Sequence, residues 1–177
     1  MSRVAAAAVD GWLSELGLAP VERAERDGIA SWDLVLDSRR RGDVRVTLML
    51  DPAMALVCWV HFAPPLGDSF RASYRRFLRW NDELPFVKFA LAEDERPVLV
   101  SELPAATLER DVVGAAIARL LAVCDLLLPD SVSWLWPGAR AAPAMDRPSR
   151  NEALFVRYEE ELRELLEATA DAEGRRA

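Results

Sequence analysis

Apolar and polar residues alternate along three consecutive stretches between residues 31 and 62, as they do in strands that bury one face. Two turns separate these stretches, at residues 39–43 and 51–54, and Gly42 in the first turn is able to take a positive φ. Pro64 and Pro65 end the third stretch, because proline cannot donate to a sheet ladder. The pattern predicts an antiparallel meander of three strands. Its inward positions are Trp32, Leu34, Leu36, Val44, Val46, Leu48, Leu50, Leu56, Cys58, Val60 and Phe62.

An amphipathic helix and a hairpin are predicted to follow the meander. The helix has an N-cap at Asp68 or Ser69, and two further strands follow it at residues 86–91 and 98–103, around the turn 92–97. In the first of these strands the residues expected to face the core are Val87, Phe89 and Leu91. Asn81 and Asp82 fall at the end of the helix, just before Pro85, and we interpret this polar pair as a joint between helix and strand.

Three other helices are predicted from the same periodicity. The first covers residues 4–16 and is capped by Gly17. A long helix begins at Glu109 or Asp111, is apolar nearly all round over residues 112–128, and is expected to end at Pro129. Residues 131–136 are expected to be extended or irregular. Ser149 and Glu152 have the spacing of a capping box for the last helix.

The order of these elements is helix, three strands, helix, two strands, helix, which predicts an α+β domain with a five-stranded antiparallel sheet. A ferredoxin-like sandwich is the alternative, and the meander argues against it because that fold alternates strand, helix and strand. By composition, residues 1–130 form the domain, 131–148 a linker containing Trp, Pro and Ala, and 149–177 a C-terminal amphipathic helix.

Composition and charge narrow the function. A chain of 177 residues with 51% apolar residues can build one domain with a sizeable core. The net charge of −7 argues against general affinity for nucleic acid or anionic lipid. Cys58 and Cys124 are far apart in apolar runs, as expected of small buried residues in a reducing compartment. The N-terminus lacks the pattern of a signal peptide, and no apolar run approaches the length of a membrane span. A cytoplasmic protein without a membrane segment is expected.

The part of the chain from residue 77 to 129 carries four features in a set order. They are Asn81 at a helix end, the run Val87-Lys88-Phe89 in a strand, Glu102 in the next strand, and Asp125 near the end of the long helix. In this order they resemble the YbjN domain family, over roughly residues 4–130. The turn 92–97 departs from the family, where a Gly turn is common, and residues 131–177 lie outside the resemblance.

The resemblance to the YbjN family implies a fold similar to class I type III secretion chaperones, which are often homodimers. It also implies a role as a sensory regulator or chaperone-like protein, and it brings no biochemical activity. By this resemblance the helix after Ser69 is the preferred dimer interface, through Phe70, Tyr74, Phe77 and Leu78. The apolarity of residues 112–128 and this aromatic stripe both favour a homodimer, although the last helix could drive pairing instead.

No catalytic constellation is visible in the sequence. The single histidine, His61, is expected to face outward from its strand, and no nucleophile motif or phosphate-binding loop accompanies it. His and Cys residues are too few for a transition-metal site. The protein is therefore predicted not to be an enzyme and to need no cofactor or metal, and an uncharacterised small enzyme or ligand sensor around His61 is the alternative.

Exposed apolar residues point instead to a partner. Val57, Trp59, Trp134 and Trp136 are the candidates, because tryptophan is enriched at binding hot spots. We therefore predict a protein-binding module, either a chaperone-like protein or a regulatory adaptor, whose partner is another polypeptide. The alternative is a nucleic-acid-binding regulator that uses a stripe of arginines at helical spacing. That stripe comprises Arg71, Arg75 and Arg79, with Arg76 beside it.

Overall fold

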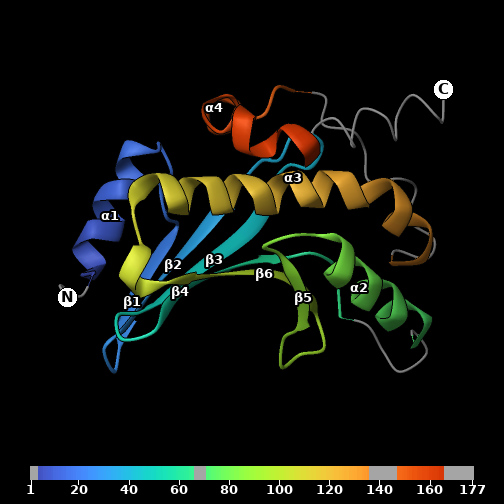
Figure 1. Ribbon diagram of the computed structural model, residues 1–177, viewed down its shortest axis with the longest axis horizontal. Helices are drawn as coiled ribbons and strands as arrows, with labels where there is room; N and C mark the ends of the chain where they lie inside the picture. Colours follow the sequence, from blue (N-terminus) through green and yellow to red (C-terminus); the bar gives the residue numbers. More distant parts are fainter. Residues whose placement is uncertain (1–3, 66–70, 136–146, 166–177) are drawn as a thin grey trace.

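The computed structural model describes residues 4–65, 71–135 and 147–165. Its strands form one antiparallel sheet in the order β1-β2-β3-β4-β6-β5 (Figure 1). The strands are β1 (Glu22–Arg26), β2 (Ile29–Leu36), β3 (Val44–Asp51), β4 (Ala55–His61), β5 (Lys88–Leu91) and β6 (Pro97–Pro104). The helices are α1 (Ala6–Glu15), α2 (Arg71–Glu83), α3 (Arg110–Leu135) and α4 (Glu152–Arg157), with a short 3-10 turn, η2 (Ala105–Thr107), before α3. The α+β class is confirmed, and the number of strands is corrected from five to six.

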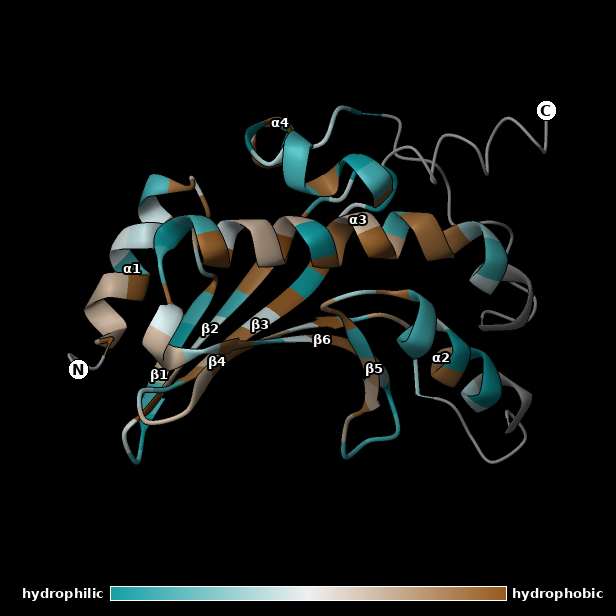
Figure 2. Ribbon diagram, in the orientation of Figure 1, coloured by the Kyte–Doolittle hydropathy of each residue, from teal (hydrophilic) through white to brown (hydrophobic). Residues whose placement is uncertain are grey.

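The predicted meander is confirmed in β2, β3 and β4. All of the positions that alternation placed inward are buried, and cross-strand pairs such as Trp32 with Leu48 and Leu48 with Cys58 join them across the sheet. Figure 2 shows apolar residues concentrated along α3 and along the strands beneath it. The period of two therefore located the main core, because one face of the sheet is covered by helix.

The sixth strand is β1, in a part of the chain where no strand was predicted. Its sequence Glu-Arg-Ala-Glu-Arg is exposed throughout and has no apolar alternation to reveal it. It pairs with β2 through a tight turn in which Asp27 has φ 52° and Gly28 has φ 80°. An Asp-Gly pair with two positive φ angles is a strong hairpin signal. The sequence evidence for this hairpin therefore lay in the turn residues Asp27 and Gly28, and not in the sequence of the strand.

The central helix is α3, which lies across one face of the sheet (Figure 1). No apolar run close to a membrane span was expected, and that was wrong by length and composition, because the stretch Arg110–Ser131 is long and apolar enough to cross a membrane. Of its apolar 18-residue window, however, 72% is buried inside the fold, as in the core helix of a globular domain. Pro129 was expected to end this helix, and that was wrong, since α3 continues to Leu135. The expectation of irregular structure after residue 130 was therefore also wrong for residues 131–135. Proline inside a helix removes one backbone hydrogen bond, here to the Asp125 carbonyl, and crowds that carbonyl. The helix nevertheless continues, because Leu127, Leu128 and Ser131 on both sides of Pro129 are buried in the fold.

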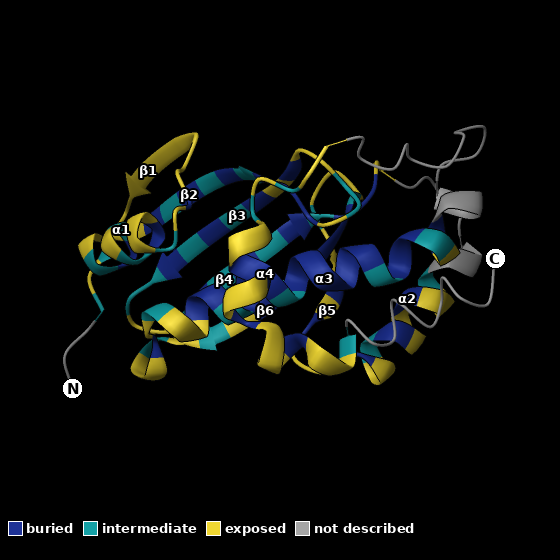
Figure 3. Cartoon of the chain, turned by 90° about the horizontal axis from the view of Figure 1, so that it is seen from above, coloured by how far each residue is buried: buried dark blue, intermediate teal, exposed yellow. Residues whose placement is uncertain are grey.

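The C-terminal segment, residues 147–165, returns over the outer side of α3 (Figure 3). Its buried side chains, Leu154, Phe155, Tyr158 and Leu162, join the same core as the sheet. The apolar surface of α3 is thus covered within one chain, on one side by the sheet and on the other by this segment, and it does not call for a second copy. The predicted capping box does not form, because the Glu152 carboxylate pairs with Arg39 at 2.6 Å.

Two local details differ from the sequence interpretation. In the β2–β3 loop Gly42 does not have a positive φ; the residue that does is Asp43, with φ 55°. Aspartate tolerates this region because its short side chain can bond locally. Leu91 does not face the core but is 50% exposed. It ends the edge strand β5, and Figure 1 shows that end of the strand running away from α3.

Helix α2 is tied to β5 by Asn81. Its side-chain Oδ1 accepts a hydrogen bond from the Phe89 backbone N–H at 2.5 Å, and its Nδ2 donates to the Phe89 carbonyl at 3.2 Å. The Lys88 ammonium donates to the carbonyls of Asn81 and Leu84, at the C-terminal end of α2. Asn81 is therefore a structural joint, as interpreted from its position, although it serves the strand and not the end of its own helix.

Asp125 attaches α3 to the β2–β3 loop. Its carboxylate accepts hydrogen bonds from the Ser38 hydroxyl at 2.6 Å and from the backbone N–H groups of Arg39 at 2.9 Å and Arg40 at 3.2 Å. Burial raises the pKa of Asp125, and these donors offset part of that rise. Because the folded protein holds this proton more tightly than the unfolded chain does, the carboxylate opposes folding as it ionises.

Asp125→Asn is expected to change how stability depends on pH. As the pH rises from the ordinary Asp value near 3.8 through the raised pKa of Asp125, the wild type should lose stability relative to the variant. Denaturant unfolding of both proteins at a series of pH values measures the difference. A constant difference across this range would contradict the raised pKa. Asp130→Asn, at an exposed position of the same helix, is the matched control.

Candidate functional site

The face of the sheet opposite α3 is the strongest candidate surface. Figure 1 shows α1, α3 and α4 on one side of the sheet and α2 beside β5, so that among the described residues no helix covers the other side of β2, β3 and β4. The side chains on this open face are mostly half-buried and mix apolar with polar types. The half-buried ones are Ser31, Asp33, Val35, Thr47, Met49, Val57, Trp59, His61 and Val100. By register the buried Val98 and the exposed Arg45 and Glu102 lie on the same face.

A row of directly opposed residues runs across the middle of the open face. Asp33 lies opposite Thr47, Thr47 opposite Trp59, and Trp59 opposite Val100. The Thr47 hydroxyl donates to Asp33 Oδ1 at 2.5 Å, which fixes both polar side chains. Opposed Cβ atoms in such a row are only about 5 Å apart, so the Trp59 ring lies against Thr47 on one side and Val100 on the other.

The open face is hollowed around Trp59. A pocket of about 600 Å³ has Trp59, Val98 and Val100 among its apolar lining residues. The β5–β6 turn forms one wall through Ala92, Glu93 and Asp94, and Asp33, Thr47 and His61 complete the lining. A hollow of this kind, apolar with a polar rim, can receive an apolar side chain while backbone polar groups beside it meet the rim.

His61 sits at the edge of this hollow and is held as an acceptor. An Arg96 guanidinium nitrogen lies 3.3 Å from its Nδ1, and because arginine can only donate, Nδ1 accepts. Burial lowers the pKa of His61, and the positive charges of Arg96 and Arg45 lower it further. His61 is thus neutral at pH 7. No serine or cysteine nucleophile lines the hollow with it, and no three His, Cys, Asp or Glu side chains in the described ranges are grouped to hold a metal.

The sequence singled out two of the residues on this face. Val57 and Trp59 point outward beside His61, as expected, and both are half-buried. For Trp134 only the backbone, within α3, is described, and Trp136 lies outside the described residues. Asp33, Thr47 and Val100 were missed as members of the site, because which strands become neighbours was not determined by the alternation along each one.

The residues proposed for a dimer interface do not share one environment. Phe77 is buried and stacks on Phe89 with ring centroids 4.4 Å apart, whereas Leu78 is 68% exposed. Tyr74 is half-buried, and Phe70 lies outside the described residues. Of this set, therefore, Leu78 is open to a partner and Phe77 belongs to the core of its own chain. The homodimer itself stays a prediction.

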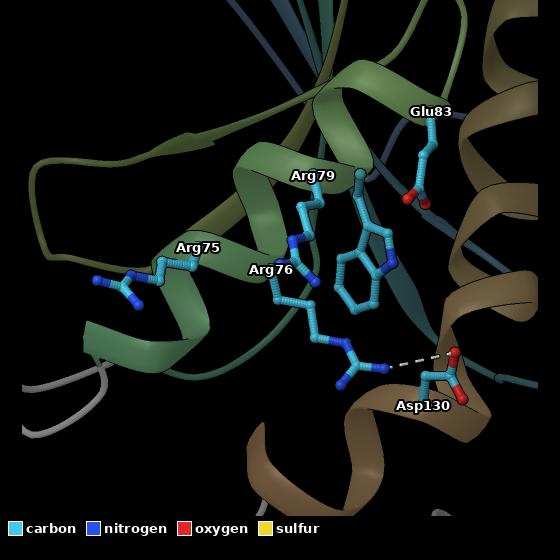
Figure 4. Close-up of a pocket in the computed structure, with 6 residues that line it drawn as sticks. Arg75, Arg76, Arg79, Glu83 and Asp130 are labelled. Atoms are coloured by element: carbon cyan, nitrogen blue, oxygen red, sulfur yellow. Dashed lines mark ion pairs between the residues drawn. The ribbon is translucent and has the colours of Figure 1, made fainter.

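Three arginines of the predicted stripe, Arg75, Arg76 and Arg79, line a smaller pocket of about 480 Å³ between α2 and the C-terminal part of α3 (Figure 4). The side chain of Arg71 lies outside the described part of the chain. Arg76 reaches Asp130 at 3.8 Å and lies over the Trp80 ring, while Figure 4 shows Arg75 pointing away from the space between the helices. Glu83 and Asp130 also line the pocket. A phosphate placed there would meet two carboxylates, which weakens the case for nucleic acid.

Comparisons with known proteins bear on the fold and family. The family model YbjN, described as "Putative bacterial sensory transduction regulator", matches residues 5–130. Among solved structures, a chain in the heterodimeric complex ExoU-SpcU from the type III secretion system of Pseudomonas aeruginosa is similar, with a TM-score of 0.45 and 18% sequence identity. The similarity covers 68% of this chain and 95% of that chain. No curated protein matches the sequence.

Proposed function

The chain belongs to the YbjN family of putative bacterial sensory transduction regulators, and from that premise we propose that it is a non-enzymatic regulator that binds another polypeptide on the open face of its sheet. The family match agrees with the resemblance first seen in Asn81, Lys88 and Asp125. The single observation that carries the proposal is the half-exposed Trp59 in the hollow, flanked by Val57 and Val100. Tryptophan is among the residue types enriched at binding hot spots.

An extended partner is better accommodated across the open face than as an extra strand paired at an edge of the sheet. The β1 edge is a run of charged residues, which natural sheets use to discourage edge pairing. The β5 edge is only four residues long and is tied to α2 by Asn81 and Lys88. In an extended partner, side chains two residues apart point the same way and are about 7 Å apart. Side chains on the open face are spaced by the same distance along each strand of the sheet. The partner would place alternate apolar side chains on Trp59 and its neighbours.

Trp59→Ala is expected to weaken binding of such a partner about 30-fold or more, which is the effect of losing a hot-spot residue worth about 2 kcal/mol. Peptides selected from a random library against the wild-type protein provide the ligands, and fluorescence anisotropy measures the dissociation constants. Met54→Ala removes another exposed apolar side chain, in the β3–β4 turn, and should leave the affinity unchanged. Equal loss in both variants, or none in Trp59→Ala, would place the binding elsewhere.

The nucleic-acid alternative makes a different prediction in the same assay. Binding through Arg75, Arg76 and Arg79 would weaken steeply with added salt, because phosphate contacts release counterions. Binding over Trp59 should change little between low and high salt. A single-stranded oligonucleotide that binds at low salt, and is lost both at high salt and in Arg75→Ala/Arg79→Ala, would support the alternative function.

A further inference from the structure

The C-terminal segment, residues 147–165, occupies a site built by the rest of the chain. It lies outside the part that matches the family model, residues 5–130, and eleven residues, 136–146, separate it from the end of α3. Its contacts are of two kinds: a polar anchor at Asp37 in the β2–β3 loop, and an apolar contact with α3 at Gly114. The core means residues 4–135 as far as they are described, and the segment means residues 147–165.

The polar anchor is Asp37, whose side chain has no exposed surface. Its carboxylate accepts from Arg147 at 2.5 and 3.2 Å, and from the Arg150 side chain at 2.9 and 2.8 Å. It also accepts from the Arg150 backbone N–H at 3.0 Å. The Asp37 backbone N–H in turn donates to Asn151 Oδ1 at 2.7 Å. Two guanidinium groups converging on one buried carboxylate make the bond both strong and directional.

The apolar contact with α3 depends on Gly114, which has no side chain. A Cβ on Gly114 would lie 2.2 Å from the Tyr158 hydroxyl oxygen, so the Tyr158 ring fits only because residue 114 is glycine. That hydroxyl donates to Asp111 at 2.9 Å. About one helical turn before Tyr158 in the segment, Phe155 is fully buried beneath the guanidinium group of Arg39, which lies 5.1 Å from the ring centroid.

Opposite charges meet along the contact, mainly core carboxylates with segment arginines, and in the reverse sense where Arg39 of the core pairs with Glu152 of the segment. The core presents three carboxylates, Asp37, Asp43 and Asp111, and the segment presents Arg147, Arg150 and Arg157. Arg150 reaches Asp43 at 2.7 Å, and Arg157 reaches Asp111 at 3.6 Å. Within the segment, residues 147–158 hold three arginines against one glutamate, so it is this first part that carries the positive charge to the three carboxylates.

We infer that this site is a second protein-binding surface, specific for a short amphipathic helix preceded by two arginines, and that residues 147–165 are its tethered ligand. The pattern that it recognises is Arg-x-x-Arg-Asn-x-x-Leu-Phe-x-x-Tyr, as in residues 147–158. A partner segment of the same chemistry binds by displacing the tethered one. A tether raises the effective concentration of its ligand to roughly millimolar, so the external partner binds only where it overcomes that advantage.

The experiment uses the full chain and a fluorescent synthetic peptide of residues 147–165. A release variant, Arg147→Glu/Arg150→Glu/Phe155→Ala, weakens the tethered ligand and leaves every receiving residue intact. A competitor at an effective concentration of about 1 mM weakens apparent binding by one plus the ratio of that concentration to its own Kd, so for a segment with a Kd of about 10 μM the labelled peptide should bind this variant about 100-fold more tightly than it binds the wild type. A peptide carrying the same three substitutions should bind neither protein. Absence of peptide binding to a folded release variant overturns the inference.

A milder variant and a cross-control complete the test. Arg150→Ala alone keeps Arg147 and the apolar contacts, and should bind the peptide with an affinity between those of the wild type and the triple variant. Hydrogen exchange of β2, β3 and β4 shows whether each variant is folded. Should both variants unfold, the segment is an inseparable part of the core and the inference fails. Adding Trp59→Ala to the release variant should not change peptide binding, since Trp59 lies on the opposite side of the sheet.

Discussion

Asp37→Ala is expected to lower the free energy of unfolding by about 3 kcal/mol at pH 7, because it removes a buried carboxylate on which several charge-assisted hydrogen bonds converge. The substitution also leaves the Asp43 backbone N–H, which donates to Asp37 at 3.0 Å, without that acceptor. Denaturant unfolding measures the loss, and hydrogen exchange should show residues 147–165 losing protection first. Asp43→Asn removes the charge of an exposed partner of the same Arg150 while keeping a residue type that tolerates the positive φ of position 43, and it should cost no more than about 0.5 kcal/mol.

The effect of Asp37 should also depend on pH. Hydrogen bonds from Arg150 hold the pKa of Asp37 far below its ordinary value, with burial opposing them and Arg147 adding to them. A carboxylate whose pKa is lowered by folding stabilises the protein above its unfolded pKa and loses that contribution as the pH falls. The difference between wild type and Asp37→Ala should therefore be constant above about pH 5 and shrink in more acidic solution. A difference that grows on acidification would contradict the ion-paired state.

Asn81→Ala is expected to cost about 2–4 kcal/mol, because it leaves both the N–H and the C=O of Phe89 without their partner beside a buried aromatic cluster. Phe89 packs against Phe62, Phe77 and Trp80, so a shift of β5 would disturb the core as well. Thermal or denaturant unfolding measures the cost. Asp82→Ala, at the next and exposed position, is the matched control and should change stability by less than about 0.5 kcal/mol.

Asn81→Asp separates the two bonds. An aspartate can still accept from the Phe89 N–H, but its carboxylate cannot donate to the Phe89 carbonyl. Its cost should therefore fall between those of Asp82→Ala and Asn81→Ala. Should Asn81→Ala prove as mild as the control, the residue would be no joint, and a role at the protein surface would have to be considered for it.

The two proposed binding surfaces lie on opposite sides of the sheet. One is the open face around Trp59, and the other is the outer side of α3 together with the β2–β3 loop, where residues 147–165 are bound. Their chemistry differs: the first is apolar with a polar rim, and the second is a row of carboxylates beside a glycine. A regulator with two such surfaces could hold one polypeptide while another competes for the tethered segment.

The sequence by itself determined the elements whose environment repeats along the chain. The alternation in β2, β3 and β4 located the core, and the long apolar run predicted α3, because a period of two or a continuous apolar stretch is produced by burial of one face or of the whole element. It also placed Val57, Trp59 and His61 outward and Asn81 at a joint. These predictions required only the neighbours of each residue along the chain.

Only the tertiary structure decided what depends on distant parts of the chain. The fully exposed β1 is held by its pairing with β2, which leaves no alternation of buried and exposed residues in its sequence. Helix α3 passes through Pro129 although proline removes one backbone hydrogen bond, because its side chains on both sides of Pro129 are packed in the fold. The partners of Asp37 are residues 110 and 113 positions away in sequence, and Tyr158 meets the bare backbone of Gly114. Whether an apolar helix is covered by its own chain or by another also depends on residues far away in sequence. Here the C-terminal segment covers α3, and its Arg147 and Arg150 bind the buried carboxylate of Asp37 in the β2–β3 loop.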